Sequence, residues 1–161
     1  MEQFRQLYET NFKKVNYYLR TLCNSEKLAE DLTQDTFYRA LVFMMDRNNY
    51  STSVQWLVKI AHNVFVDYVR KNRIPLEDLE DIHSEFPGEH PDHSKRLDLV
   101  QILNQLPLRY KSFILLCDHY GFSYREIAEI MNCTESTVKV TLSRARNRFK
   151  EVYAEYERGT R

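Results

Sequence analysis

Glycine and proline are scarce and unevenly distributed in this sequence. Of 161 residues, only three are glycine and four are proline, and none of these lies within residues 1–74. Because both residues interrupt helices, their absence argues against a turn-rich first half. Three prolines and Gly88 instead cluster between Pro75 and Pro91, in a polar and acidic stretch. This cluster predicts a linker between two modules.

Long apolar runs are also missing. No stretch approaches the roughly 18 apolar residues that a membrane helix needs. The acidic residues between Met1 and Tyr18 argue against a secretory signal. We therefore expect no membrane insertion and a cytoplasmic location. Cys23, Cys117 and Cys133 are odd in number and form no Cys-x-x-Cys pair, which argues against a disulfide framework and a zinc site.

The sequence shows no assembled catalytic or cofactor-binding motif. A Gly-rich phosphate loop is absent. His83, His90 and His93 lie in the expected linker, where no scaffold would hold a metal. Cys117 and His119 lack the third group that orients a nucleophile and its base. We therefore expect no enzyme activity, no metal and no cofactor.

The charge is balanced in total but segregated along the chain. Lysine plus arginine and aspartate plus glutamate each number 23, which excludes a strongly basic or acidic chain. Residues 74–97 contain seven acidic and two basic residues, whereas the segments on either side carry net charges of +3 and +2. Two mildly basic modules therefore flank an acidic segment.

Apolar residues recur with a helical period of 3.6, and no segment alternates as a strand does. Helices are predicted over residues 1–22, 26–43, 53–71, 97–106 and 107–118, with two more beyond Gly121. The predicted fold is therefore all-α, with two small helical domains joined by an acidic flexible linker. The expected boundaries are 1–73 for the first domain, 74–96 for the linker and 97–161 for the second domain.

The second domain carries the signals of a helix-turn-helix. Ser123 and Glu126 form a Ser-x-x-Glu capping box, which opens a short helix. Residues 132–134 predict a turn, and Thr134 can cap a final helix that reaches about Tyr156. In a helix-turn-helix, the second helix enters the major groove of DNA while the first crosses the backbone.

The final helix separates apolar from basic residues. An inward stripe is predicted for Val138, Leu142, Ala145, Phe149 and Val152. The outer arc carries Lys139, Val140, Ser143, Arg144, Arg146, Asn147 and Lys150. Between residues 138 and 150 there are five cations and no anion. Such residues neutralise phosphates and bind guanine edges, but a basic helix face taken alone is more often an ordinary solvated surface. The capping box, the tight turn and the inward stripe together favour DNA binding.

The helix at 53–71 carries a polar stripe that is predicted to lie opposite the core. Its members are Lys59, His62, Asn63, Val66, Arg70 and Arg73, and the preceding loop adds Asn48, Asn49 and Tyr50. Cations follow a nucleic-acid backbone, while amides and aromatic rings hold unstacked bases. From this helix alone, a nucleic-acid face and an ordinary solvated face are about equally supported.

The helix at 26–43 has an outer face of a different kind. Asp31, Gln34, Asp35 and Tyr38 project together. An acidic and amide face suits a basic protein helix better than it suits DNA. Charge alone favours an ordinary solvent-facing surface here.

Five motifs follow one another along nearly the whole chain. They are Ala29–Phe37 (AEDLTQDTF), Trp56–Asn63 (WLVKIAHN), Leu103–Pro107 (LNQLP), Phe122–Ile130 (FSYREIAEI) and Thr137–Arg146 (TVKVTLSRAR). Together they resemble the extracytoplasmic-function (ECF) bacterial sigma factors. The resemblance implies core RNA polymerase and promoter DNA as partners, with a separate anti-sigma factor as a possible regulator.

The resemblance also implies roles for individual residues. The segment with Asp31, Gln34 and Asp35 would dock on the clamp coiled coil of the beta-prime subunit, and the second domain would meet the beta flap. The minus-ten element would be read and melted by Lys59, His62, Asn63 and Arg70, and the loop at 46–53 (with Asn48, Asn49 and Tyr50) would capture a flipped base. The minus-thirty-five element would be read by Thr137, Lys139, Val140, Ser143, Arg144 and Arg146. Val140 departs from the small polar residue of many relatives, and it would suit a thymine methyl group rather than a polar base edge.

Two rival functions remain at this point. A stand-alone transcriptional regulator would combine the helix-turn-helix with a helical sensor or dimerisation half, and it would bind duplex DNA without polymerase. A helical enzyme that uses the histidine and cysteine groups lacks an assembled catalytic set.

Overall fold

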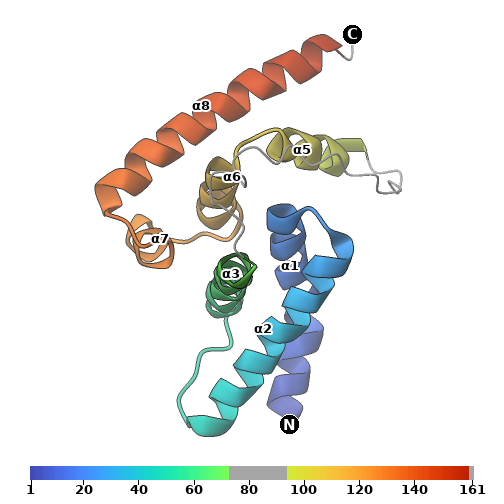
Figure 1. The fold of residues 1–161 in the computed structure, drawn as a ribbon, viewed down its shortest axis with the longest axis vertical. Helices are drawn as coiled ribbons and strands as arrows, with labels where there is room; N and C mark the ends of the chain where they lie inside the picture. The colour runs from blue at the N-terminus through green and yellow to red at the C-terminus, as the bar shows by residue number, and fades with distance from the viewer. Residues whose placement is uncertain (73–93, 160–161) are drawn as a thin grey trace. The chain divides into compact units, whose positions relative to one another are not determined.

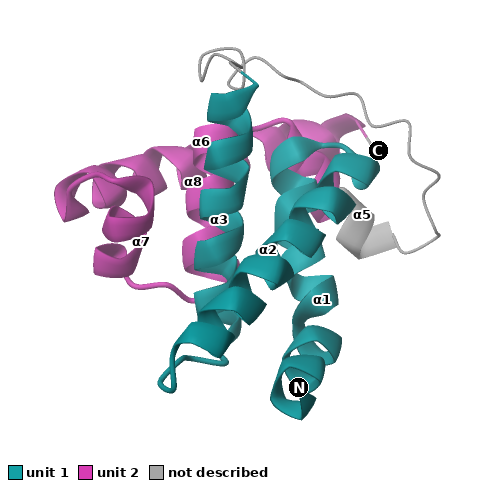
Figure 2. Ribbon diagram, turned by 60° about the horizontal axis from the view of Figure 1, so that its bottom comes forward, with its two compact units in different colours: residues 1–74 teal, residues 75–161 magenta. Residues whose placement is uncertain are grey.

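The computed structural model describes residues 1–72 and 94–159, and within these ranges every regular element is a helix. The chain divides into two compact units, Met1–Ile74 and Pro75–Arg161 (Figure 2). The prediction of two small helical domains is confirmed. The predicted flexible linker lies outside the described residues, except for the first three residues of α5. No helix in the described parts of the chain is both long and apolar enough to cross a bilayer.

Unit 1 consists of three helices that pack against one another: α1 (Glu2–Cys23), α2 (Glu26–Asp46) and α3 (Val54–Lys71) (Figure 1). Asn24 ends α1 in the left-handed region, with φ of 52°. The Ser25 hydroxyl caps α2 by accepting from the Leu28 N–H, and the Ser53 hydroxyl caps α3 in the same way. Consequently, short polar side chains fix the starts of α2 and α3.

The core of unit 1 follows the predicted helical stripes. Ala29, Thr36 and Ala40 of α2 are fully buried, as are Leu57 and Ala61 of α3. Burial of a leucine-sized side chain contributes about 1.5–3 kcal/mol, so this small core depends on each of its members. Helix α2 continues three residues beyond the predicted end at residue 43, which shortens the loop before α3.

Unit 2 contains α5 (Ser94–Asn104), α6 (Leu108–Ile114), the π-helical turn η1 (Leu115–His119), α7 (Tyr124–Met131) and α8 (Glu135–Gly159). Sequence periodicity predicts one α-helix over 107–118, but its second half is π-helical. Leu115 and Leu116 in this turn are both buried. Gly121 then adopts φ of +74°, a conformation that favours glycine, and α6–η1 ends before it as predicted.

Candidate nucleic-acid interface

The helix-turn-helix of unit 2 is built from local capping interactions. The Ser123 hydroxyl accepts from the Glu126 N–H at 3.1 Å, and the Glu126 carboxylate accepts from the Ser123 N–H at 3.3 Å. Asn132 ends α7 in the left-handed region, with φ of 53°. The Thr134 hydroxyl accepts from the Thr137 N–H at 3.1 Å and so caps α8. The predicted capping box, turn and cap are all confirmed.

Helix α8 separates its inner and outer faces largely as predicted, although Phe149 of the predicted inward stripe is only half-buried. Val138, Leu142 and Ala145 are completely buried, and Val152 is nearly so. The outer face exposes Lys139, Val140, Ser143 and Arg144. Val140 is 47% exposed. This face can therefore present cations and one apolar group to a partner.

The arginines of α8 differ in their ion pairing. Among the described residues, Arg144 has no acidic partner. The Arg146 guanidinium instead donates to both carboxylate oxygens of Asp118, at 2.7 and 3.2 Å, and this hydrogen bonding raises the pKa of Arg146. Burial raises the pKa of the neighbouring Cys117 thiol, and Asp118 adds to the rise. Arg144 is thus available to an external anion, whereas Arg146 ties α8 to η1.

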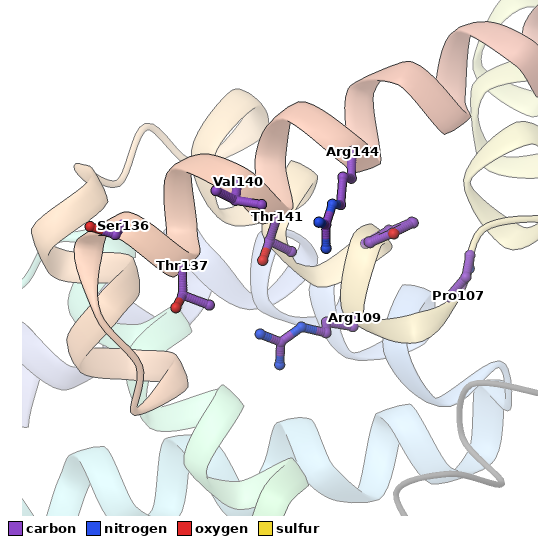
Figure 3. A pocket seen from close by; sticks show the side chains of 8 residues that line it. Pro107, Arg109, Ser136, Thr137, Val140, Thr141 and Arg144 are labelled. Atoms are coloured by element: carbon purple, nitrogen blue, oxygen red, sulfur yellow. The ribbon is translucent and has the colours of Figure 1, made fainter.

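An open concavity of about 580 Å³ lies between α6 and α8 (Figure 3). Its lining residues are Pro107, Arg109, Tyr110, Ser136, Thr137, Val140, Thr141 and Arg144. Three of the predicted DNA-reading residues, Thr137, Val140 and Arg144, therefore border one hollow. The Thr137 hydroxyl also bonds the Thr134 hydroxyl at 2.9 Å.

On α3, one residue that was predicted to face nucleic acid is buried instead. Lys59, Asn63 and Arg70 are exposed, but His62 is only 6% exposed. The ring Nδ1 of His62 lies 2.8 Å from the Tyr18 hydroxyl of α1, and burial lowers the pKa of His62 from 6.5 to about 4. The prediction that His62 faces nucleic acid is therefore wrong in this structure. His62 is a neutral residue of the unit 1 core.

The loop before α3 is partly anchored. Asn48 and Asn49 are exposed, whereas Tyr50 is half-buried and its hydroxyl donates to the Gln3 side chain of α1. The Arg47 guanidinium lies 4.7 Å from the centre of the Phe43 ring. The two asparagines are thus the freer of the predicted base-capturing residues.

The outer face of α2 holds its polar side chains in defined positions. Asp31 and Gln34 are exposed, and the Gln34 amide donates to the Tyr8 hydroxyl at 3.3 Å. Asp35 accepts from Arg39 at 3.5 Å, and Arg39 also donates to Asp67 of α3 at 2.8 Å. The Asp35–Arg39 spacing of four residues is readable from the sequence. The contact of Gln34 with Tyr8 and that of Arg39 with Asp67 were not predicted, because each joins two different helices.

An apolar ridge continues this face toward the end of α2. Tyr38 is 65% exposed and Met45 is 76% exposed, with Val42 between them at helical spacing. Tyr38 was predicted to lie on this face, but the apolar ridge was not predicted from the sequence. Exposed large apolar side chains at helical spacing are typical of a surface that another protein covers.

Comparison with known proteins decides the family. Residues 7–74 match the family described as Sigma-70 region 2, and residues 96–149 match Sigma-70, region 4. The ECF RNA polymerase sigma factor SigM of Bacillus subtilis is 31% identical over 153 aligned residues, which cover 92% of this chain and 93% of SigM. The chain belongs to the ECF sigma factor family.

Two further similarities agree with this assignment. The ECF RNA polymerase sigma factor SigE of Mycolicibacterium smegmatis is 31% identical, and the match covers 99% of this chain and 65% of SigE. A solved structure, the sigma factor RpoE in complex with the anti-sigma factor NepR from Bartonella quintana, is 29% identical. It has a TM-score of 0.74 over 94% of this chain and 97% of that chain.

As an ECF sigma factor, this protein acts with core RNA polymerase at promoter DNA in transcription initiation. The region 2 match spans α1 to α3, and the region 4 match extends from α5 well into α8. The comparisons support the sigma factor function and not the alternative of a stand-alone regulator.

Proposed function

We propose that this sigma factor joins core polymerase through the outer face of α2, with Asp31, Gln34 and Asp35 docking on the clamp coiled coil of the beta-prime subunit. Three observations support this role. The face is exposed, its Gln34 and Asp35 side chains are held by neighbouring groups, and the apolar ridge lies beside it. Unit 2 would contact the beta flap. The protein works by binding, in the cytoplasm, and performs no catalysis of its own.

Two separate surfaces then read the promoter. Lys59, Asn63 and Arg70 of α3, with Asn48 and Asn49 of the loop, contact the minus-ten element and assist its melting. The outer face of α8 reads the minus-thirty-five element. The observation that carries this proposal is the division of α8 into an inner face with the buried Val138, Leu142 and Ala145 and an exposed face on which Arg144 has no acidic partner in the described chain.

Arg144→Ala should lower holoenzyme affinity selectively for promoters with an intact upstream element. A guanidinium that binds a guanine edge contributes about 1–3 kcal/mol of discrimination, so we expect a loss of roughly 10-fold or more. The measurement is filter binding on the promoter and on a version with a scrambled upstream element. Arg158→Ala removes the same charge at the far end of α8 and serves as the control. A uniform loss on both DNAs would mean that Arg144 contacts phosphate only.

Asn63→Ala should impair open-complex formation more than closed-complex binding. Its exposed amide is suited to hold an unstacked base, and that contact exists only after melting. Permanganate footprinting reports unpaired thymines, and binding at low temperature reports the closed complex. Asn72→Ala, which removes an exposed amide near the end of α3, is the control. Equal loss of both complexes in Asn63→Ala would refute a melting role.

Regulation by a separate protein is part of the proposal. The similar sigma factor RpoE was solved in complex with the anti-sigma factor NepR. By analogy, an anti-sigma factor would bind this chain and block its access to polymerase. Co-purification with the chain expressed in its host tests for such a partner.

A further inference from the structure

The concavity between α6 and α8 has the chemistry of an anion site. Arg109 of α6 and Arg144 of α8 bring two guanidinium groups to it, and none of its lining residues in the described part of the chain carries a carboxylate (Figure 3). Hydroxyl groups come from Ser136, Thr137 and Thr141. Guanidinium and hydroxyl donors around an open hollow match a phosphate group, which offers several acceptor oxygens.

Arg109 is free to serve such a ligand. Its side chain is exposed, and among the residues that the structure describes it has no acidic partner. Its guanidinium carbon lies 5.2 Å from the centre of the Phe113 ring, and Phe113 is completely buried. A fixed ring that supports a guanidinium restrains its position while leaving N–H donors for an anion. Arg109 is thus held in place without being neutralised.

We propose that this concavity binds one backbone phosphate of the promoter DNA, beside the groove that α8 enters, with Arg109 as the principal donor. The inference rests on the proposed role of α8 in reading the upstream element. Thr137, Val140 and Arg144 belong both to the concavity and to the reading face, so a phosphate held there lies next to the bases being read. Arg109 lies outside the helix-turn-helix and carries no base information. It is a positioning residue that sets the register of α8 on the duplex.

The first test is the salt dependence of promoter binding by the holoenzyme. Neutralising one phosphate contributes about 0.9 to the slope of log K against log salt concentration. Arg109→Gln should therefore reduce the slope by about that amount and weaken binding roughly tenfold, equally on promoters with intact and scrambled upstream elements. Arg109→Lys should retain the slope because the charge remains. Arg158→Ala should leave both the slope and the affinity unchanged. An unchanged slope in Arg109→Gln would overturn the proposal.

The second test locates the phosphate. Single phosphates around the upstream element are replaced in turn by neutral methylphosphonates. For the wild-type holoenzyme, a methylphosphonate at one position should lower the promoter affinity about as much as the Arg109→Gln substitution does. The Arg109→Gln variant should lose no further affinity when the methylphosphonate is at that position. Additive losses at every position would show that Arg109 contacts no phosphate. A melting curve of each variant, unchanged from wild type, shows that the Phe113 contact is not the cause.

Two controls separate this proposal from its alternatives. Arg144→Ala in the same assay must lose discrimination at the upstream element. If the wild type itself does not discriminate between intact and scrambled upstream elements, the proposed function of α8 is wrong. The phosphate proposal, which rests on that function, then fails with it. Titration of the free protein with inorganic phosphate tests for a small-anion site. Saturable binding that Arg109→Gln abolishes, together with an unchanged DNA salt slope, would assign the concavity to a free anion and contradict our proposal.

Discussion

Replacing Asp31 and Gln34 together with alanine should weaken the association with core polymerase by at least roughly 100-fold. Each side chain offers hydrogen-bonding groups to a basic partner surface, and a hydrogen bond that involves a charged group contributes about 1.5–3 kcal/mol. Both side chains are exposed, and within residues 1–72 and 94–159 the one hydrogen bond that these substitutions remove is that from Gln34 to the Tyr8 hydroxyl. The free energy of unfolding should therefore change little.

Titration of fluorescently labelled protein with core polymerase measures this affinity. Glu9→Ala, which removes an exposed carboxylate from α1, should bind as the wild type does. A second variant, Tyr8→Phe, removes only the hydroxyl that holds Gln34 and should show a small loss. If the Asp31/Gln34 double variant binds core polymerase as tightly as the wild type, α2 does not dock through this face.

Acidification should destabilise unit 1 through His62. The pKa of this histidine is lowered to about 4 in the folded state from 6.5 in the unfolded state. The unfolded chain therefore binds the proton first. The free energy of unfolding keeps its full value above pH 6.5 and falls as the pH is lowered from 6.5 toward 4. The expected loss by pH 4 is about 3 kcal/mol. The cause is burial, since the ring is 6% exposed and packs against Tyr18.

The measurement is denaturant unfolding at several pH values, followed by the fluorescence of Trp56. This is the only tryptophan in the chain and it lies in α3, so it reports on unit 1. His62→Gln keeps a hydrogen-bonding group for Tyr18 but cannot titrate, and its unfolding free energy should fall less than that of the wild type. His119→Gln, at an exposed position of unit 2, is the control. Identical pH profiles for the wild type and His62→Gln would show that His62 is not kept neutral by the fold.

Local signals in the sequence predicted the helices and the helix-turn-helix well. The capping box of Ser123 and Glu126 and the cap by Thr134 depend on residues three positions apart, so a sequence contains all that they need. The inward stripe of α8 was equally predictable, because an apolar repeat at helical spacing has only one way to be buried. The role of each exposed residue toward DNA or polymerase stays a prediction.

Contacts between distant segments were not predictable in this way. His62 lies on the line of Val58, Phe65 and Val69, all of them buried, and its polar character concealed that spacing. Its partner Tyr18 is 44 residues away in the chain. Arg146 pairs with Asp118 across 28 residues, so the sequence alone could not distinguish it from Arg144, which has no acidic partner among the residues that the structure describes. The sequence shows that a side chain is charged, but it does not show whether a residue of another helix already forms an ion pair with it.

The most direct test of the central claim is run-off transcription with purified core polymerase and a panel of genomic DNA from the host. The claim is that two helical units, mounted on core polymerase, read two elements of the same promoter. It predicts transcripts with defined start sites that require this protein, and that disappear when either the upstream element or the spacing between the elements is changed. If no template yields specifically initiated transcripts, or if such transcripts are indifferent to both changes, the claim is contradicted.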